Sequence, residues 1–265
     1  MANKDIVKNL TLFFILAFSM SWVLWLPTVL ISQDVQIPGF LQIPGQFATW
    51  MPGLAAIIVL AKSNGRQGVK SLFKSAWNWK FNKLWLLPTL LLPAAMIFLS
   101  LAIKVPVEGT KFTFGEIPAP LPIFIFILFF VGGPMEEFGW RGYALPRLLK
   151  KTSFLWASIV LGILHGLWHL PLHFMDGTVQ SYIPVWEFIA VTAVGSIIYT
   201  WIFINTSGSL TAMILHHWAA NLASALLIYW DTSFGRWVFF GIQLIVAVII
   251  VIVYRKKNTE VIYET

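Results

Sequence analysis

The sequence predicts an all-α fold, a polytopic transmembrane helical bundle of about eight spans. Of its 265 residues, 58% are hydrophobic and only 11% are charged, whereas about a quarter of the residues of a soluble domain are charged. Its apolar stretches approach about twenty residues, the length of a membrane-spanning helix, and lipid offers the backbone no hydrogen-bond partners outside helices and closed barrels. Residues 1–265 are therefore expected to form a single integral membrane domain in the lipid bilayer.

The apolar stretches give the expected spans in chain order. We place them at Leu10–Ile31, Ile43–Ala61, Leu84–Ile103, Ile117–Met135, Phe154–Pro171, Ile183–Ile204, Leu210–Trp230 and Trp237–Tyr254. The first stretch is too long for the core of a signal peptide and lacks a small-residue cleavage site, so it is expected to be retained. The longest polar connection, Lys62 to Lys83, is too short to hold a soluble domain.

The positions of lysine and arginine predict the orientation. With the N-terminus in the cytoplasm, fifteen of the eighteen basic residues fall on the cytoplasmic side, and only Lys104, Lys111 and Arg236 do not. Cytoplasmic connections are enriched in Lys and Arg, and one span more or fewer would scramble this pattern. Both termini are therefore expected in the cytoplasm of a bacterial cell. The net charge of +7 arises from basic residues in the connections between the apolar stretches, where they set the orientation of the spans, so no nucleic-acid partner is expected.

An adjacent pair of carboxylates, Glu136 and Glu137, closes the expected fourth span. Ionisable groups at membrane depth are costly unless they are paired or hydrated, so such a pair suggests a functional site. On a helix, Glu137 and Arg141 share a face and can form an ion pair, which leaves Glu136 free for chemistry. The alternative is a salt bridge that only holds a span end at the membrane interface.

All five histidines lie in or just beyond the expected fifth and seventh spans. His165, His169 and His173 repeat every four positions and would form a polar stripe, with His173, beyond Pro171, as the expected bystander. Two histidines four apart on a helix can bind zinc, and without cysteine any metal would need His, Asp, Glu or Asn ligands. The alternative is hydrogen bonding to a neighbouring helix.

A third group lies within the expected seventh span. His217 and Asn221 are four apart, so both are expected to face one cavity, where an imidazole and a carboxamide can donate hydrogen bonds to an oxyanion. His216 is rotated by about a hundred degrees and need not join them. The alternative role for these side chains is hydrogen bonding between packed helices.

Together, the three groups supply a water-activating base, a partner for the water and donors for a tetrahedral intermediate. These are the requirements for amide hydrolysis inside a membrane. Cysteine is absent, no serine nucleophile motif is present, and the few aspartates occupy loops. Attack by activated water is therefore favoured over a covalent route.

Three motifs resemble those of the CPBP intramembrane endopeptidases, also called the Abi family, which includes the type II CAAX prenyl endopeptidase and bacteriocin-processing or self-immunity proteins. The E-E-x-x-x-R motif corresponds to Glu136–Arg141, the histidine of the second motif to His169, and H-x-x-x-N to His217–Asn221. The resemblance covers roughly residues 131–221 and suggests a catalytic core at about 117–230.

The resemblance implies an endopeptidase in which Glu136 and His169 activate water and His217 and Asn221 stabilise the oxyanion. It implies that Glu137 and Arg141 support the first motif. One departure from the family is His165, which stands where phenylalanine is usual and adds a polar contact or a metal ligand. A mechanism without a cofactor is favoured, and zinc is the alternative, with Glu136, His165, His169 and His217 as the candidate ligands.

Two other functions are compatible with the same residues. A proton-coupled transporter could use the histidine stripe as a relay, but the sequence has no evident inverted repeat. A non-enzymatic immunity or scaffold protein would bind a partner in the membrane. For an endopeptidase, the expected substrate is a peptide or protein, prenylated or otherwise membrane-associated, that enters a cavity facing the cytoplasm.

The expected boundaries also raise a problem of depth. They place Glu136 near the cytoplasmic face but His169 near the far end of the fifth span. The site can assemble only if the fourth span extends through Arg141, or if the fifth is tilted or broken at Pro171.

Overall fold

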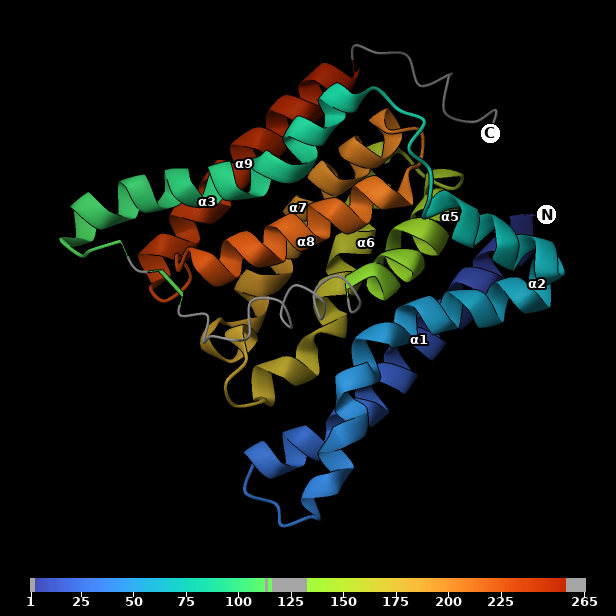
Figure 1. Ribbon diagram of the computed structural model, residues 1–265, viewed down its shortest axis with the longest axis horizontal. Helices are drawn as coiled ribbons and strands as arrows, with labels where there is room; N and C mark the ends of the chain where they lie inside the picture. The colour runs from blue at the N-terminus through green and yellow to red at the C-terminus, as the bar shows by residue number, and fades with distance from the viewer. Residues whose placement is uncertain (1–2, 113, 116–132, 256–265) are drawn as a thin grey trace.

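The computed structural model describes residues 3–112, 114–115 and 133–255, and most of this length is helical (Figure 1). Within these ranges there is no strand, and the one β-type pairing is an isolated bridge between Phe114 and Leu227. The prediction of an all-α fold is confirmed.

The helices keep the labels of Figure 1. The α-helices are α1 (Asn3–Ser32), α2 (Met51–Ser75), α3 (Leu86–Glu108), α5 (Leu145–Leu149), α6 (Phe154–Trp168), α7 (Val185–Asn205), α8 (Leu210–Leu226) and α9 (Ser233–Arg255). The 3₁₀-helices are Gly39–Trp50, Lys83–Trp85, Leu170–Phe174 and Val179–Tyr182, and a π-helical turn spans Trp140–Ala144.

Six segments in the described part of the chain are long and apolar enough to cross a membrane. They are Asp5–Ser32, Gly39–Ser75, Lys83–Glu108, Phe154–Phe174, Val185–Asn205 and Ser233–Tyr254. Each overlaps one expected span. The expected seventh span forms α8, of 17 residues, and the expected fourth span, 117–135, falls mostly outside the described residues. The chain is a polytopic helical membrane protein.

Close packing of the backbone joins α6 to α7, the two helices with the most extensive mutual contact. A methyl group added at Gly162 would lie 2.5 Å from the carbonyl oxygen of Thr192, and one at Gly166 would lie 2.4 Å from the hydroxyl oxygen of the same residue. Small residues let membrane helices approach this closely. Figure 1 shows α3 and α9 along one side of the molecule and α1 with α2 along another.

The prediction of a polar connection from Lys62 to Lys83 is wrong for its first part, because α2 continues as a helix through Ser75. Lysine and arginine are good helix formers, and Leu72 still packs into the core. The helix bends at Gly65, whose φ of 60° suits a residue without a side chain. The charged residues therefore mark the membrane boundary and not the end of the helix.

The expected end of the fourth span at Met135 is also wrong, because the backbone stays helical from residue 133 to Leu149. Arg141, expected in a cytoplasmic connection, lies inside the bundle and is 2% exposed. Glu136 lies thirteen positions before Leu149, or about 20 Å along a helix. Since α6 then runs back from Phe154, His165 reaches the same depth. This extension, with the end of α6 at Trp168, removes the problem of depth.

Candidate active site

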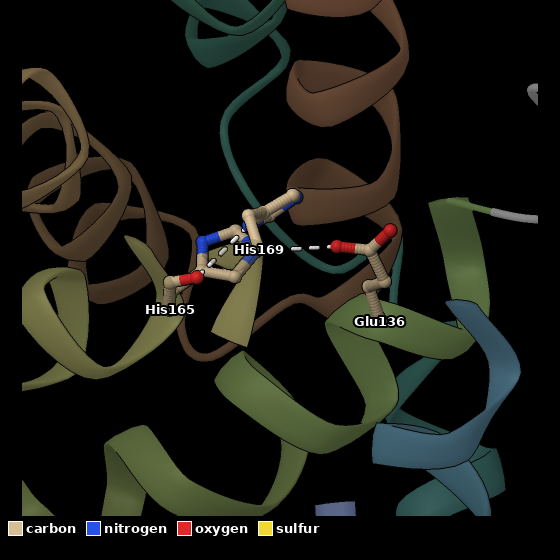
Figure 2. A group of neighbouring side chains, drawn as sticks. All are labelled: Glu136, His165 and His169. Carbon is tan, nitrogen blue, oxygen red and sulfur yellow. Dashed lines mark hydrogen bonds and ion pairs between the residues drawn. The ribbon is translucent and has the colours of Figure 1, made fainter. Parts of the chain in front are cut away.

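Glu136 faces the last turn of α6. Its side chain is buried, 6% exposed, and Oε2 lies 3.2 Å from Nε2 of His165 (Figure 2). When Glu136 is ionised, it can only accept a hydrogen bond, so Nε2 of His165 carries the proton and donates it. His165 therefore orients the carboxylate.

His169 lies at the end of α6, where the helix stops because Pro171 has no N–H to donate to the carbonyl of Leu167. Its Nδ1 is 2.9 Å from the carbonyl oxygen of His165 (Figure 2). A carbonyl only accepts, so Nδ1 carries the proton, and in the neutral ring Nε2 keeps a lone pair. His169 is thus set up to accept a hydrogen bond from water or to bind a metal ion.

The second glutamate has different partners. Oε1 of Glu137 accepts from Nη1 of Arg141 at 2.8 Å and from Nδ1 of His217 at 2.7 Å. Glu137 is fully buried, and the guanidinium of Arg141 lies 4.0 Å from the ring centroid of Tyr199. The predicted pairing of Glu137 with Arg141 is confirmed. The hydrogen bond from His217, which ties this helix to α8, was not predicted.

Residues from both groups, the one around Glu136 and the one around Glu137, border one cavity of about 480 Å³. Glu136, His165, His169, His217 and Asn221 all line it, so the prediction that His217 and Asn221 face one cavity is confirmed. Among the residues that the structure describes, none makes a hydrogen bond to the side chain of Asn221. A cavity of this size can hold a segment of a peptide.

Comparison with known proteins agrees with the motifs. A family model described as type II CAAX prenyl endopeptidase, Rce1-like, matches residues 118–223. The protein named CAAX prenyl protease 2 of Methanococcus maripaludis is 31% identical over 265 residues, which cover 94% of this chain and 95% of the relative. This chain belongs to the CAAX prenyl endopeptidase family. The family resemblance predicted from the three motifs is confirmed, and membership supports an endopeptidase, a hydrolase, embedded in the membrane.

Two histidines of this CAAX endopeptidase family member lie apart from the cluster, as expected. Nδ1 of His216 donates to the carbonyl of Thr89 at 2.8 Å, and His216 lines a smaller cavity of about 60 Å³ that adjoins the large one. Nδ1 of His173 donates to the carbonyl of Ile183 at 3.0 Å.

The opposite wall of the large cavity contains residues that the sequence did not single out. The ring of Tyr199 in α7 contacts the guanidinium of Arg141, and both residues line the cavity. Glu187 of α7 and Arg236 of α9 form an ion pair at 2.6 Å and also line it. The only signal in the sequence is that Glu187 and Arg236 are isolated charges at the starts of apolar spans. Tyr199 has no such signal.

Glu136, His165 and His169 also fit a metal ion by donor type. One carboxylate oxygen and one nitrogen from each histidine lie within 4.8 Å of one another, and zinc accepts carboxylate and imidazole ligands. An ion bound there would replace the hydrogen bond between Glu136 and His165. His217, the fourth candidate ligand, has Nδ1 engaged with Glu137, so only its Nε2 could take part.

Proposed function

We propose that this protein is an intramembrane endopeptidase that hydrolyses a peptide bond with water activated by Glu136 and His169. The observation that carries the proposal is the grouping of the Glu136 carboxylate with the nitrogens of His165 and His169 on the wall of the 480 Å³ cavity. Membership of the CAAX prenyl endopeptidase family supports it.

In the proposed reaction, a water molecule donates one hydrogen bond to Glu136 and the other to Nε2 of His169. Its remaining lone pair is then directed at the carbonyl carbon of the substrate. As the water oxygen bonds to this carbon, Glu136 takes a proton from the water. When the carbon–nitrogen bond breaks, Glu136 returns that proton to the leaving nitrogen. His165 is a positioning residue that holds the carboxylate.

We assign the oxyanion site to Asn221 and His217. The carboxamide of Asn221 has N–H groups that can donate without further change. Because Nδ1 of His217 already donates to Glu137, Nε2 of His217 can donate only when the ring is doubly protonated. The buried carboxylate of Glu137 would stabilise that charge, and Arg141 holds Glu137 in place. Glu137 and Arg141 are thus positioning residues.

The second candidate mechanism is zinc-dependent hydrolysis, favoured by the same grouping of Glu136, His165 and His169. A bound zinc ion would polarise the carbonyl and lower the pKa of a bound water. We place the reaction without a cofactor first, because Nε2 of His165 already lies within hydrogen-bonding distance of Glu136.

The proposed setting is a cell membrane with both termini in the cytoplasm. A bacterial source stays a prediction, and the relative named above is archaeal. The proposed substrate is a peptide or a membrane-associated protein; the name of the relative suggests prenylated proteins as one class.

The test is cleavage of a peptide library, prenylated and unmodified, by the purified protein and by Glu136→Gln. Glu108→Gln is the matched control, because Glu108 accepts from Thr232 outside the cavity. We expect cleavage by the wild type and the control but not by Glu136→Gln. Equal cleavage by all three would refute the role of Glu136. No cleavage by any of them would favour a scaffold protein or a transporter.

A further inference from the structure

A single amide side chain interrupts the apolar sequence of α9. Gln243 lies near the middle of the helix, and every other residue from Val238 to Val253 is apolar or glycine. A polar group at membrane depth is costly unless it is hydrogen-bonded, so such a residue ordinarily bonds to a neighbouring helix or serves a function. The carboxamide offers one oxygen acceptor and two N–H donors for this purpose.

The carboxamide of Gln243 makes no such bond within the described part of the chain. The residue is 6% exposed, and its Oε1 is buried without a hydrogen-bond partner among the described residues. Its nitrogen lies against Gly195 of α7, where an added methyl group would be 2.9 Å from Nε2. Glycine at position 195 therefore leaves room for a carboxamide that no described residue binds.

Gln243 lies at the junction of two cavities. It lines the 480 Å³ cavity that Glu136 and His169 also line, and it lines the adjoining cavity of about 60 Å³. Ala220, which directly precedes the proposed oxyanion donor Asn221, lines both cavities too, so the junction lies beside the proposed reaction centre. The residues common to the two cavities are Gly195, Tyr199, Ala220, Ser224, Phe239 and Gln243.

The small cavity extends from this junction toward α3. The residues that line it but not the large cavity are Pro93, Met96, Ile97, Ile198 and His216. Nδ1 of His216 is already bonded to the carbonyl of Thr89. This recess is mostly apolar, so it can take the side chain of a residue whose peptide group stays at the junction, beside Gln243.

A peptide that fills the junction and Gln243 have matching needs. Each residue of a peptide carries a backbone C=O and, unless it is proline, an N–H, and these groups need partners once water has been displaced. Oε1 of Gln243 has the same need, because leaving a buried acceptor unpaired is unfavourable. A peptide N–H directed at Oε1 satisfies both groups at once.

We infer that Gln243 is a substrate-binding residue whose Oε1 accepts a hydrogen bond from a peptide N–H of the substrate at the junction of the two cavities. The inference rests on the proposed endopeptidase function and adds to it a contact outside the reacting atoms. It also accounts for a carboxamide in an otherwise apolar stretch of α9.

The first experiment compares stability with peptide binding for Gln243→Leu, which keeps a similar volume and removes both hydrogen-bonding groups. Binding is measured in detergent in the Glu136→Gln protein, so cleavage is not required. The ligands are fluorescent peptides from the prenylated and unmodified library that this protein retains. Gln67→Leu, the same change at an exposed position of α2, is the matched control.

We expect Gln243→Leu to bind these peptides about tenfold more weakly, while Gln67→Leu binds them as before. The unfolding transition of Gln243→Leu should be unchanged or raised, since leucine in place of an unpaired amide suits a buried site. Unchanged binding would overturn the inference. Weaker binding accompanied by lower stability would also overturn it and would make Gln243 a bond between helices.

The second experiment identifies the bonded N–H. An ester oxygen replaces one peptide N–H of a retained peptide, position by position. We expect one ester to weaken binding about tenfold when Gln243 is present and to have no effect with Gln243→Leu, because both changes remove the same hydrogen bond.

Equal losses with both proteins at every position would contradict the assignment, as would failure of the Glu136→Gln protein to retain any peptide. Peptides that bind through Gln243 but are never cleaved by the wild type would instead refute the endopeptidase function and leave this contact standing.

Discussion

Two glutamates that are adjacent in the chain have opposite surroundings. Glu136 lies on the cavity wall and, within the described part of the chain, accepts a hydrogen bond only from His165, whereas Glu137 is fully buried and accepts from both Arg141 and His217. Successive residues of a helix point about 100° apart, so one carboxylate can face the substrate while the next faces the neighbouring helices. The comparison separates a group available for reaction from a group that holds the site together.

The comparison predicts the largest effect for Glu136→Gln. The amide can still accept from His165, so the fold should be kept, but it cannot take a proton from water. We expect kcat/KM for a cleaved peptide to fall about a thousandfold or more, with an unchanged unfolding transition followed by tryptophan fluorescence in detergent. Substantial residual cleavage would remove Glu136 from the role of base.

Glu137→Gln should act on stability as well as on activity. It leaves Arg141 and His217 without their carboxylate in a buried site, and removing one partner of a buried ion pair costs about 3–5 kcal/mol. Denaturant unfolding in detergent micelles measures this loss. If Glu137→Gln were as stable as the wild type and lost only kcat, the distinction between the two glutamates would be wrong.

Asn221→Ala tests the oxyanion site. Removing one oxyanion donor lowers kcat by about 10²- to 10³-fold, and we expect KM to change little. Asn205→Ala is the matched control, because Asn205 donates to the carbonyl of Trp201 near the far end of α7. A rise in KM with constant kcat would instead indicate a role in binding the ground state.

His165→Phe restores the aromatic residue that is usual in the family and should have a smaller effect. Loss of a hydrogen bond to a charged group costs about 1.5–3 kcal/mol, which corresponds to a fall in kcat of about ten- to a hundredfold. Zinc content and sensitivity to a chelator, measured alongside, decide between the two mechanisms. Stoichiometric zinc in the wild type that His165→Phe loses would support the metal-dependent reaction.

His173→Gln should have the smallest effect. His173 donates to Ile183 outside the catalytic group, so we expect cleavage rates close to those of the wild type. A large loss would extend the catalytic group along the histidine stripe.

Local spacing predicted part of the site correctly. The ion pair between Glu137 and Arg141 follows from their separation of four on a helix. The hydrogen bond between His217 and Glu137 joins residues 80 apart in the chain, and no local pattern encodes it. The predicted end of the fourth span at Met135 was wrong because Arg141, although charged, lies inside the bundle and pairs there with Glu137. The π-helical turn at Trp140–Ala144 also has no signature in the sequence.

The contact between α6 and α7 leaves no room for one added carbon atom at Gly162 or Gly166. Since His165 and His169 lie on the same stretch of α6, the position of both histidines depends on the surface that α7 offers. A bulkier residue at Ala193 would push α6 away as surely as a side chain at Gly162. Substitutions along this contact should therefore be tolerated only in compensating pairs, one on each helix. We expect residues of α7 to covary with residues of α6 among related sequences, although α7 contributes none of the proposed catalytic residues.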